Sequence, residues 1–443
     1  MRLRLALLIV AASSALPSVY AWGAAGTVIF YPSASARRPN ASSGHEIVAT
    51  IAQIHLHPSV LPVICDLMDI EPSDHSEASL RRQCHLAPIA TWADRERMRM
   101  RWSSAMHHIE AVDDNPGDDC QYPGAGGWAG TKRINLLDAI KNVTGILADW
   151  SGVDEHDNSG RTLLVPTAPR RATFLRVGGR SLSPRPAGPR EKEAFKFLVH
   201  FIGEFHQPLH LTRRQRGGHG ALVYFEGRLS NLHRVWGTGL LARLIRIVPP
   251  QYSSPLPDRS DLPIPSQQIE LALRHAIYDP LVRRVMWEGV ESKWINDIDD
   301  WISCPAVPTA PAPESQSTSI LSIVSGVLSN PWTLPRALVK IVSSASRERV
   351  DILPDGPRVC PYAWSTPVHA LNCKYVWPPA LIANATKPKV EEFSHARAAR
   401  PPILDTPAYM AALDDNLVLE KLVAQGGLRL AGVLNWLFAT KEA

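Results

Sequence analysis

His200-Phe-Ile-Gly-Glu204-Phe-His-Gln-Pro-Leu-His210 is the stretch that decides the fold, because it combines helical spacing with metal-binding side chains. His200 and Glu204 are four residues apart, so both project from one face of a helix. Pro208 ends or kinks that helix, and His210 lies just beyond it. Because the neighbouring side chains are apolar, we expect this face to be buried, where an unpaired carboxylate is costly. A bound zinc ion would satisfy it, and a buried His–Glu pair without metal is the alternative.

Other imidazoles and acids along the chain favour the metal interpretation. They are His45 after Gly44, Asp94 in Thr91-Trp-Ala-Asp-Arg-Glu-Arg97, His107 and His108 before Glu110, and His233 in Asn231-Leu-His. Any one of these residues alone is more often an ordinary His or Asp. Together they supply enough ligands for more than one zinc.

Helical periodicity dominates the rest of the chain. Apolar residues recur at helical spacing over 46–56, 194–205, 240–247, 271–286 and 409–438. We expect Gly426-Gly427 to interrupt the last of these helices. Only 221–225 has the pattern of a short strand, and we place it in a small hairpin. The predicted class is therefore mainly α.

The N-terminus predicts export. Arg2 and Arg4 precede an apolar run over 5–12, and Val19-Tyr20-Ala21 is a small-x-small cleavage site. This pattern is typical of a signal peptide over residues 1–21, with a buried first helix as the alternative. We expect a secreted chain that starts at Trp22, with no membrane span. Its formal charge would fall from +5 to +3, with 45 basic and 42 acidic residues, a mild balance that does not by itself indicate a nucleic-acid binder.

The chain has 443 residues, of which 45% are hydrophobic, which is ample for a core. We expect a single helical domain over 22–443. Three stretches rich in Pro, Ser, Arg or Gly do not fit a compact helical body. These predicted insertions lie near 27–43, 162–190 and 306–349.

Six cysteines, an even number in an exported chain, suggest disulfides. Cys65–Cys84 and Cys360–Cys373 are favoured because they close short loops, which leaves Cys120–Cys304. A zinc-thiolate site is the weaker alternative, since the chain has no CxxC pair. Asn142 and Asn384 stand in acceptor tripeptides for glycosylation, which we expect at the surface.

In these motifs the chain resembles the zinc-dependent single-strand-specific nuclease and 3′-nucleotidase family of fungi and plants, the S1/P1 family. The matching pieces are Trp22-Gly23, Gly44-His45, Trp92-Ala-Asp94, the His107 segment, His200 to Glu204, Gln207 to His210, Gly217-Gly218 and Asn231-Leu-His233. Bacterial zinc phospholipases C share this helical scaffold, so the scaffold alone does not fix the substrate.

The resemblance implies up to three zinc ions. The first would be held by Asp94, His107, His200 and Glu204. The third would be held by the α-amino group and carbonyl of Trp22, by His45 and by Glu204. The second would be held by His210, His233 and one further carboxylate. Two close cations bind a phosphate oxygen and lower the pKa of a water between them, while another stabilises the leaving oxygen.

The resemblance also implies roles for three further residues. Arg97 would face the charge that develops on the phosphate, and a surface salt bridge is its alternative. Glu110 would lie near the attacking water, and a plain solvated acid is its alternative. His108 is a departure, because it stands where the family often has an aromatic that stacks on the base; imidazole can stack as well, and packing or simple exposure is its alternative.

This chain departs from the family pattern at three places among the ligands. Glu204 stands where the family has Asp, which lengthens the side chain by one methylene. Gly237 stands where the second zinc expects a carboxylate, so that site keeps two side chains, unless Glu226 substitutes. The gap from Trp22 to His45 is long, and removing 27–43 would leave Trp-Gly-Ala-Ala-Gly-Gly-His. A surface loop or an unspliced intron would explain it.

We therefore expect a monomeric, zinc-dependent endonuclease. It would hydrolyse single-stranded RNA and DNA to 5′-phosphorylated products and remove phosphate from 3′-nucleotides. A zinc phospholipase C and a metal-deficient inactive relative are the two alternatives.

Overall fold

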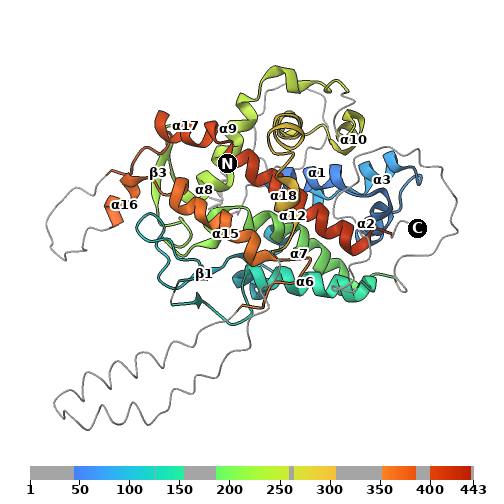
Figure 1. Ribbon diagram of the computed structural model, residues 1–443, viewed down its shortest axis with the longest axis horizontal. Coiled ribbons are helices and arrows are strands. Elements are labelled where there is room, and N and C mark those ends of the chain that lie inside the picture. Colours follow the sequence, from blue (N-terminus) through green and yellow to red (C-terminus); the bar gives the residue numbers. More distant parts are fainter. Residues whose placement is uncertain are drawn as a thin grey trace, which may run out of the picture.

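The computed structural model describes residues 44–124, 126–153, 186–258, 264–305, 352–385 and 400–440. Outside these ranges lie the predicted signal over 1–21, Trp22 and the insertions at 27–43 and 306–349. Residues 162–185 of the insertion predicted near 162–190 also lie outside them. The described part is mainly helical, which confirms the predicted class (Figure 1). The α-helices are α1 (Gly44–His55), α2 (Leu61–Leu67), α3 (Glu77–Gln83), α4 (Ala87–Ala90), α5 (Trp92–Glu96), α6 (Leu136–Ser151), α7 (Pro189–Phe205), α8 (Leu232–Arg234), α9 (Leu240–Ile247), α10 (Ser266–Ala272), α11 (Asp279–Arg284), α12 (Ile298–Ile302), α15 (Pro361–Leu371), α16 (Pro379–Ala385), α17 (Pro407–Asp415) and α18 (Val418–Phe438).

Shorter helical turns connect them. The 3₁₀ turns are η1 (Pro58–Val60), η2 (Arg101–His107), η3 (Pro208–Leu211) and η5 (Pro250–Ser253). The π-helical turns are η4 (Val235–Gly239), η6 (Val285–Lys293) and η8 (Asn372–Val376).

Helix α18 runs diagonally through the centre of the molecule and packs against α1, α7 and α12 (Figure 1). Both Gly426 and Gly427 lie inside this continuous helix, so the predicted interruption is wrong. A Cβ atom on Gly427 would lie 2.4 Å from Ile51 Cγ2 of α1. The glycines therefore let two buried helices approach closely. The chain breaks earlier, at Leu417, whose φ is +49°.

Helix α7 carries the metal-binding motif through the core. It begins at Pro189, and the Glu191 carboxylate accepts a hydrogen bond from the Gly188 N–H at 2.9 Å. Every residue from Phe197 to its end at Phe205 is buried. Because Pro208 cannot continue the helix, the chain turns into η3, as the sequence predicts.

The predicted single helix over 271–286 is two helices. Helix α10 ends at Ala272, and α11 begins at Asp279, whose side chain accepts a hydrogen bond from the Ala276 N–H at 3.0 Å. Pro280 stands in the first turn of α11, where its missing N–H costs nothing. The same proline in a helix interior would remove a hydrogen bond, so the division follows from this residue.

Two small antiparallel hairpins complete the described part. Strands β3 (Leu222–Phe225) and β4 (Arg228–Asn231) pair with Val223 opposite Ser230, which confirms the predicted hairpin. Strands β1 (Glu110–Ala111) and β2 (Trp128–Ala129) form a second pair that the sequence pattern missed.

All six cysteines form disulfides, but two of the favoured pairings are wrong. Cys65–Cys84 is confirmed, and the other bonds are Cys120–Cys373 and Cys304–Cys360. Cys360 precedes α15 and Cys373 follows it. Eleven helical residues span about 16 Å, whereas bonded cysteines have Cα atoms about 6 Å apart. Loop length was therefore the wrong criterion.

Among the described residues, no single helix is long and apolar enough to cross a bilayer. The pair Gly44–His55 and Pro58–Leu67 meets the criterion only when taken together, and it is bent by 116°. Asn142 is exposed on α6, while the side chain of Asn384 lies outside the described part. Glycosylation of both stays a prediction.

Candidate metal centre

Glu204, near the end of α7, lies at the centre of the predicted ligand set. Its carboxylate is 1% exposed and accepts a hydrogen bond from His107 Nδ1 at 2.9 Å. His200 Nε2 lies 3.2 Å from Glu204 Oε1, and His210 Nδ1 lies 3.9 Å away. Residues from α7, η2 and η3 thus meet at one carboxylate. The additional methylene of Glu204 therefore does not keep it from reaching the imidazoles.

His45 enters the same cluster from the start of α1. Its ring stacks on that of His200 with centroids 4.3 Å apart. Ligand atoms of His45, His200 and Glu204 lie within 4.8 Å of one another, so together they could hold an ion. A Cβ atom on Gly203 would lie 2.3 Å from His45 Nδ1, so the glycine makes room for the imidazole. Nothing in the sequence pattern indicates this role for Gly203.

Asp94 and His107 complete the surroundings of Glu204. Asp94 projects from the short helix α5, and His107 is the last residue of η2. Burial raises the pKa of the Asp94 carboxyl above its usual value. Its Oδ2 atom is buried and has no hydrogen-bond partner among the described residues.

His210 and His233 form a second imidazole group, with ring centroids 5.0 Å apart. His210 Nδ1 donates to the His107 carbonyl at 2.6 Å, and His233 Nδ1 donates to the Gly217 carbonyl at 2.8 Å. Since a carbonyl only accepts, each ring carries its proton on Nδ1. Nε2 is then left with a free lone pair, the form in which imidazole binds metals. His200 Nδ1 likewise donates to the Ala90 carbonyl at 2.8 Å, which directs its Nε2 toward Glu204.

The glycine pair of the sequence motif shapes this second group. Gly217 and Gly218 have φ of +61° and +81°, a region that favours glycine. A Cβ on Gly217 would lie 2.7 Å from the Leu209 carbonyl oxygen. The tight turn they make directs the Gly217 carbonyl at His233.

A cavity of about 450 Å³ opens onto these groups. Its walls contain most of the residues predicted for the site: Asp94, Arg97, His107, His108, Glu110, Glu204, His210 and His233. His45 and His200 lie beneath it, packed against Glu204. His108 is exposed, and its Nε2 atom lies 3.9 Å from Glu110 Oε1. Trp22 lies outside the described residues, so its role stays a prediction.

Sequence reasoning missed three basic or imidazole side chains of this cavity. Arg213 and Arg216 are exposed on its wall, and His219 is half-buried there. All three stand between His210 and His233, close to Gly217-Gly218. A basic residue or imidazole next to a recognised ligand motif was the signal that could have identified them.

The charges of the cluster follow from its burial. Burial lowers the pKa of His45 well below its usual value, and nearby His200 lowers it further. Burial opposes the charged form of His200, but the carboxylates of Glu204 and Asp94 and the Ala90 carbonyl together outweigh it and raise the pKa of His200 to about 9. Burial likewise opposes ionisation of Glu204, yet His107 and His200 hold its pKa well below the usual range. Glu204 is therefore a buried anion among imidazoles.

The donor set fits divalent cations. Both ring nitrogens of His45 and Nε2 of His210 are buried without a hydrogen-bond partner in the described ranges. Buried polar atoms in proteins are nearly always satisfied, so such a concentration of unsatisfied ligand atoms needs an explanation. Imidazole nitrogen and carboxylate oxygen are the ligands that zinc prefers. A group of cations would satisfy them.

Glu226, the predicted substitute for a carboxylate at Gly237, is not part of the site. It lies at the turn between β3 and β4, forms an ion pair with Arg246 and does not line the cavity. The second imidazole group therefore obtains no carboxylate from this residue.

Helices that converge on a buried carboxylate and several imidazoles define a mainly helical protein with a candidate multi-cation centre. A family model described as S1/P1 nuclease matches residues 41–294. The chain therefore belongs to the S1/P1 nuclease family, a family of hydrolases that act on phosphodiester bonds, as the sequence motifs indicate.

The curated proteins to which the chain is similar are also named nucleases or endonucleases. The chain is similar to Nuclease S1 of Aspergillus oryzae, 29% identical over 201 residues, or 44% of this chain and 53% of that protein. Nuclease P1 of Penicillium citrinum is 30% identical over 206 residues, 46% of this chain and 58% of the relative. Endonuclease 2 of Arabidopsis thaliana is 25% identical over 231 residues, or 51% of this chain and 58% of that protein. The chain thus spans little more than half the length of these relatives.

Proposed function

We propose that this chain is a secreted, zinc-dependent endonuclease that hydrolyses single-stranded RNA and DNA to 5′-phosphorylated products. We also propose that it removes phosphate from 3′-nucleotides. The observation that carries the proposal is the clustering of Asp94, His107, His200 and Glu204 next to one cavity. These residues come from three separated segments, and they leave ligand atoms unsatisfied.

The first zinc would be held by Asp94, His107, His200 and Glu204. A zinc next to it would be held by His45, Glu204 and the terminal groups of Trp22. His210 and His233 would hold the remaining ion. When bound, these ions polarise the phosphate ester and lower the pKa of a water, so that attack proceeds near neutral pH.

The chain's own side chains would bind and orient the nucleic acid. Arg97 faces the cavity, where a guanidinium can stabilise the negative charge of the phosphate during attack. Arg213 and Arg216 on the wall would hold neighbouring phosphates of the strand. His108 is exposed at the same cavity, and its ring would stack on a base. Glu110 would orient the attacking water.

The proposal is tested with protein purified from a secreting host and loaded with zinc. We expect soluble nucleotides from single-stranded RNA and DNA, slower cleavage of duplexes, 5′-phosphate ends and release of phosphate from 3′-AMP. The His200→Ala variant should lose these activities, while the exposed His75→Ala variant should keep them. Release of phosphocholine from lipid micelles without cleavage of RNA would establish the phospholipase alternative instead. No turnover of any substrate would favour the metal-deficient alternative.

A further inference from the structure

The second cation site is one ligand short in this chain. His210 and His233 supply two imidazoles, and Gly237 has no side chain to supply the third donor. Structural zinc sites have four ligands, and catalytic sites keep three from the protein and leave one position open. Two side chains are thus too few for a stable site, unless another residue contributes.

His219 is a half-buried imidazole next to this pair. Its ring stacks on that of His233 with centroids 3.8 Å apart, and it lines the same cavity. His219 Nδ1 donates to the Arg216 carbonyl at 2.8 Å. Its Nε2 atom is buried, with no hydrogen-bond partner within the described ranges.

His210, His219 and His233 therefore share one pattern. In each ring, Nδ1 is fixed by a backbone carbonyl, and Nε2 is the remaining atom. Imidazoles that bind metals almost always donate their other ring N–H to a carbonyl or carboxylate, which fixes tautomer and orientation. His219 thus has the second-sphere contact expected of a ligand.

We propose that His219 is the third protein ligand of the cation held by His210 and His233, in place of the carboxylate that Gly237 lacks. This inference rests on the proposed metal centre. Three neutral imidazoles and an open position make up a known type of catalytic zinc site. Compared with a site that contains a carboxylate, this one leaves more positive charge on the ion, which favours binding of a phosphate oxygen.

The three imidazoles must rearrange to hold one ion, because among the described residues the ligand atoms of His210, His219 and His233 do not all lie within 4.8 Å of one another. Rings of two imidazoles on one tetrahedral zinc have centroids about 5 Å apart, given zinc–nitrogen bonds of about 2 Å. His210 and His233 already have this spacing, at 5.0 Å. His219 and His233 are closer, at 3.8 Å, so the His219 ring must swing away by roughly an ångström. It can do so because the side chain is only half-buried.

Other acids near the pair are less suited to this role. The Glu226 carboxylate forms an ion pair with Arg246 and does not line the cavity. Glu110 lines the cavity, but it stands on the segment that carries His108. Its carboxylate lies 3.9 Å from His108 Nε2. Asp94 and Glu204 belong to the first group of ligands. Glu110 is the competitor that the experiment includes.

The test counts zinc per chain by elemental analysis after dialysis at a fixed free zinc concentration. We expect His219→Ala to hold one zinc fewer than the parent, the same loss that His210→Ala shows. The most weakly bound zinc should lose more affinity than the roughly 10- to 100-fold that is typical of an outer-sphere change. His219→Ala with Gly237→Asp should regain the zinc, because the second change supplies the missing carboxylate.

Controls keep the outcome interpretable. His75→Ala removes an exposed histidine and should leave the zinc count unchanged. The proposal would be overturned if the His219→Ala variant held as many zinc ions as the parent, or if Glu110→Gln lost the ion instead. Either result would leave the proposed nuclease function intact. A parent that holds no zinc would instead defeat the proposed function itself. Circular dichroism verifies that each variant is folded, and the rescue by Gly237→Asp rules out a merely structural effect.

Discussion

At the scale of single residues, the buried carboxylate of Glu204 organises the site. Hydrogen bonds and ion pairs with His107 and His200 hold it in one position beneath the cavity. The backbone next to it contributes as well, because Gly203 leaves space for His45. The neighbourhood of Glu204 is thus packed tightly enough that one methyl group should disturb it.

Substituting Gly203→Ala tests this packing. The new Cβ would lie 2.3 Å from His45 Nδ1, so we expect the imidazole to be displaced. The predicted result is a loss of about tenfold or more in cleavage of single-stranded RNA, together with one zinc fewer per chain. Gly145→Ala on α6 is the matched control, because nothing lies within 4 Å of its added Cβ. Equal activity in both variants would contradict the placement of His45.

The cavity arginines make a second prediction. In Arg213→Gln with Arg216→Gln, we expect KM for single-stranded RNA to rise several-fold with little change in kcat, since both residues would contact phosphates away from the reacting bond. The slope of log binding constant against log salt should shrink by about 0.7 for each lost contact. Arg228→Gln, exposed on β4, should change neither quantity. An unchanged salt slope in the double variant would refute the role of these arginines.

The sequence predicted much of the site and missed the rest for physical reasons. Helical spacing placed His200 and Glu204 together, and motifs located Asp94, His107, His210 and His233. His219 and the cavity arginines were missed because their roles depend on a turn. That turn requires positive φ at Gly217 and Gly218, and it brings the segment back over the cavity.

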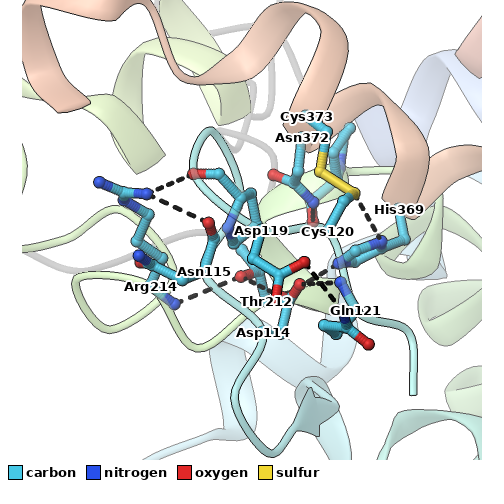
Figure 2. The surroundings of a disulfide bond; sticks show 12 residues. Asp114, Asn115, Asp119, Cys120, Gln121, Thr212, Arg214, His369, Asn372 and Cys373 are labelled. Atoms are coloured by element: carbon cyan, nitrogen blue, oxygen red, sulfur yellow. Dashed lines mark hydrogen bonds and ion pairs between the residues drawn. A yellow bond between two sulfur atoms is a disulfide. The ribbon is translucent and has the colours of Figure 1, made fainter. Parts of the chain in front are cut away.

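At the scale of elements, the Cys120–Cys373 bond ties the C-terminal helices to the site. Figure 2 shows Asp114 between Thr212 and His369, next to this disulfide. Thr212 lines the cavity, and Asn372 Nδ2 donates to the Pro208 carbonyl at 2.7 Å. Segments far apart in the chain thus support η3, which carries His210.

Removing that disulfide should destabilise the protein more than removing Cys65–Cys84. The bonds close loops of 253 and 19 residues. The chain-entropy model gives a difference of about 2 kcal/mol in the free energy of unfolding. We would measure denaturant unfolding of Cys120→Ser with Cys373→Ser beside Cys65→Ser with Cys84→Ser. A larger loss in the second variant would contradict this estimate.

Elements were predicted well where spacing alone decides and poorly where tertiary contacts decide. Helix α9 and strand β3 follow the expected bounds within a residue or so. Glycines weaken helices, which is why the sequence predicts an interruption at Gly426-Gly427. In the structure, close packing of α18 on α1 overrides that preference. Likewise, helix α15 keeps apart two cysteines that are near in sequence.

At the scale of the whole molecule, buried neutral histidines outside the site should make stability depend on pH. His85 accepts a hydrogen bond from the Ala87 N–H at 3.0 Å on Nδ1, while Nε2 donates to the Ala272 carbonyl at 2.8 Å. Burial lowers the pKa of His85 to about 3, and it does the same for His55. In the folded protein these two histidines therefore stay neutral at pH values where they are protonated in the unfolded chain, in which the pKa of histidine is about 6.5.

The sign of the effect follows directly. Since the folded pKa is below the unfolded one, the unfolded state binds more protons between about pH 6.5 and 3. The free energy of unfolding therefore falls as pH falls through this window, by about 1.4 kcal/mol per pH unit for each such histidine. We expect His85→Gln to reduce the slope between pH 6 and 4 by that amount. His75→Gln, an exposed control, should leave it unchanged, and equal slopes for parent and His85→Gln would contradict the account.

The mainly α class was predictable from the sequence because apolar residues recur at helical spacing throughout the chain. The convergence of distant ligands was inferred from motifs, since composition and a mild net charge indicate nothing about it. The N-terminus and the insertions, apart from residues 186–190, lie outside the described residues, so the domain bounds and the signal stay predictions.

The most direct test of the central claim is the cleavage of single-stranded RNA by chelator-stripped protein as zinc is added back. The claim is that imidazoles and acids around Glu204 hold zinc ions for phosphodiester hydrolysis. We predict that stripping abolishes release of soluble nucleotides and that activity returns only after more than one zinc per chain is bound. Full cleavage by the stripped protein, or none at any zinc concentration, would contradict the claim.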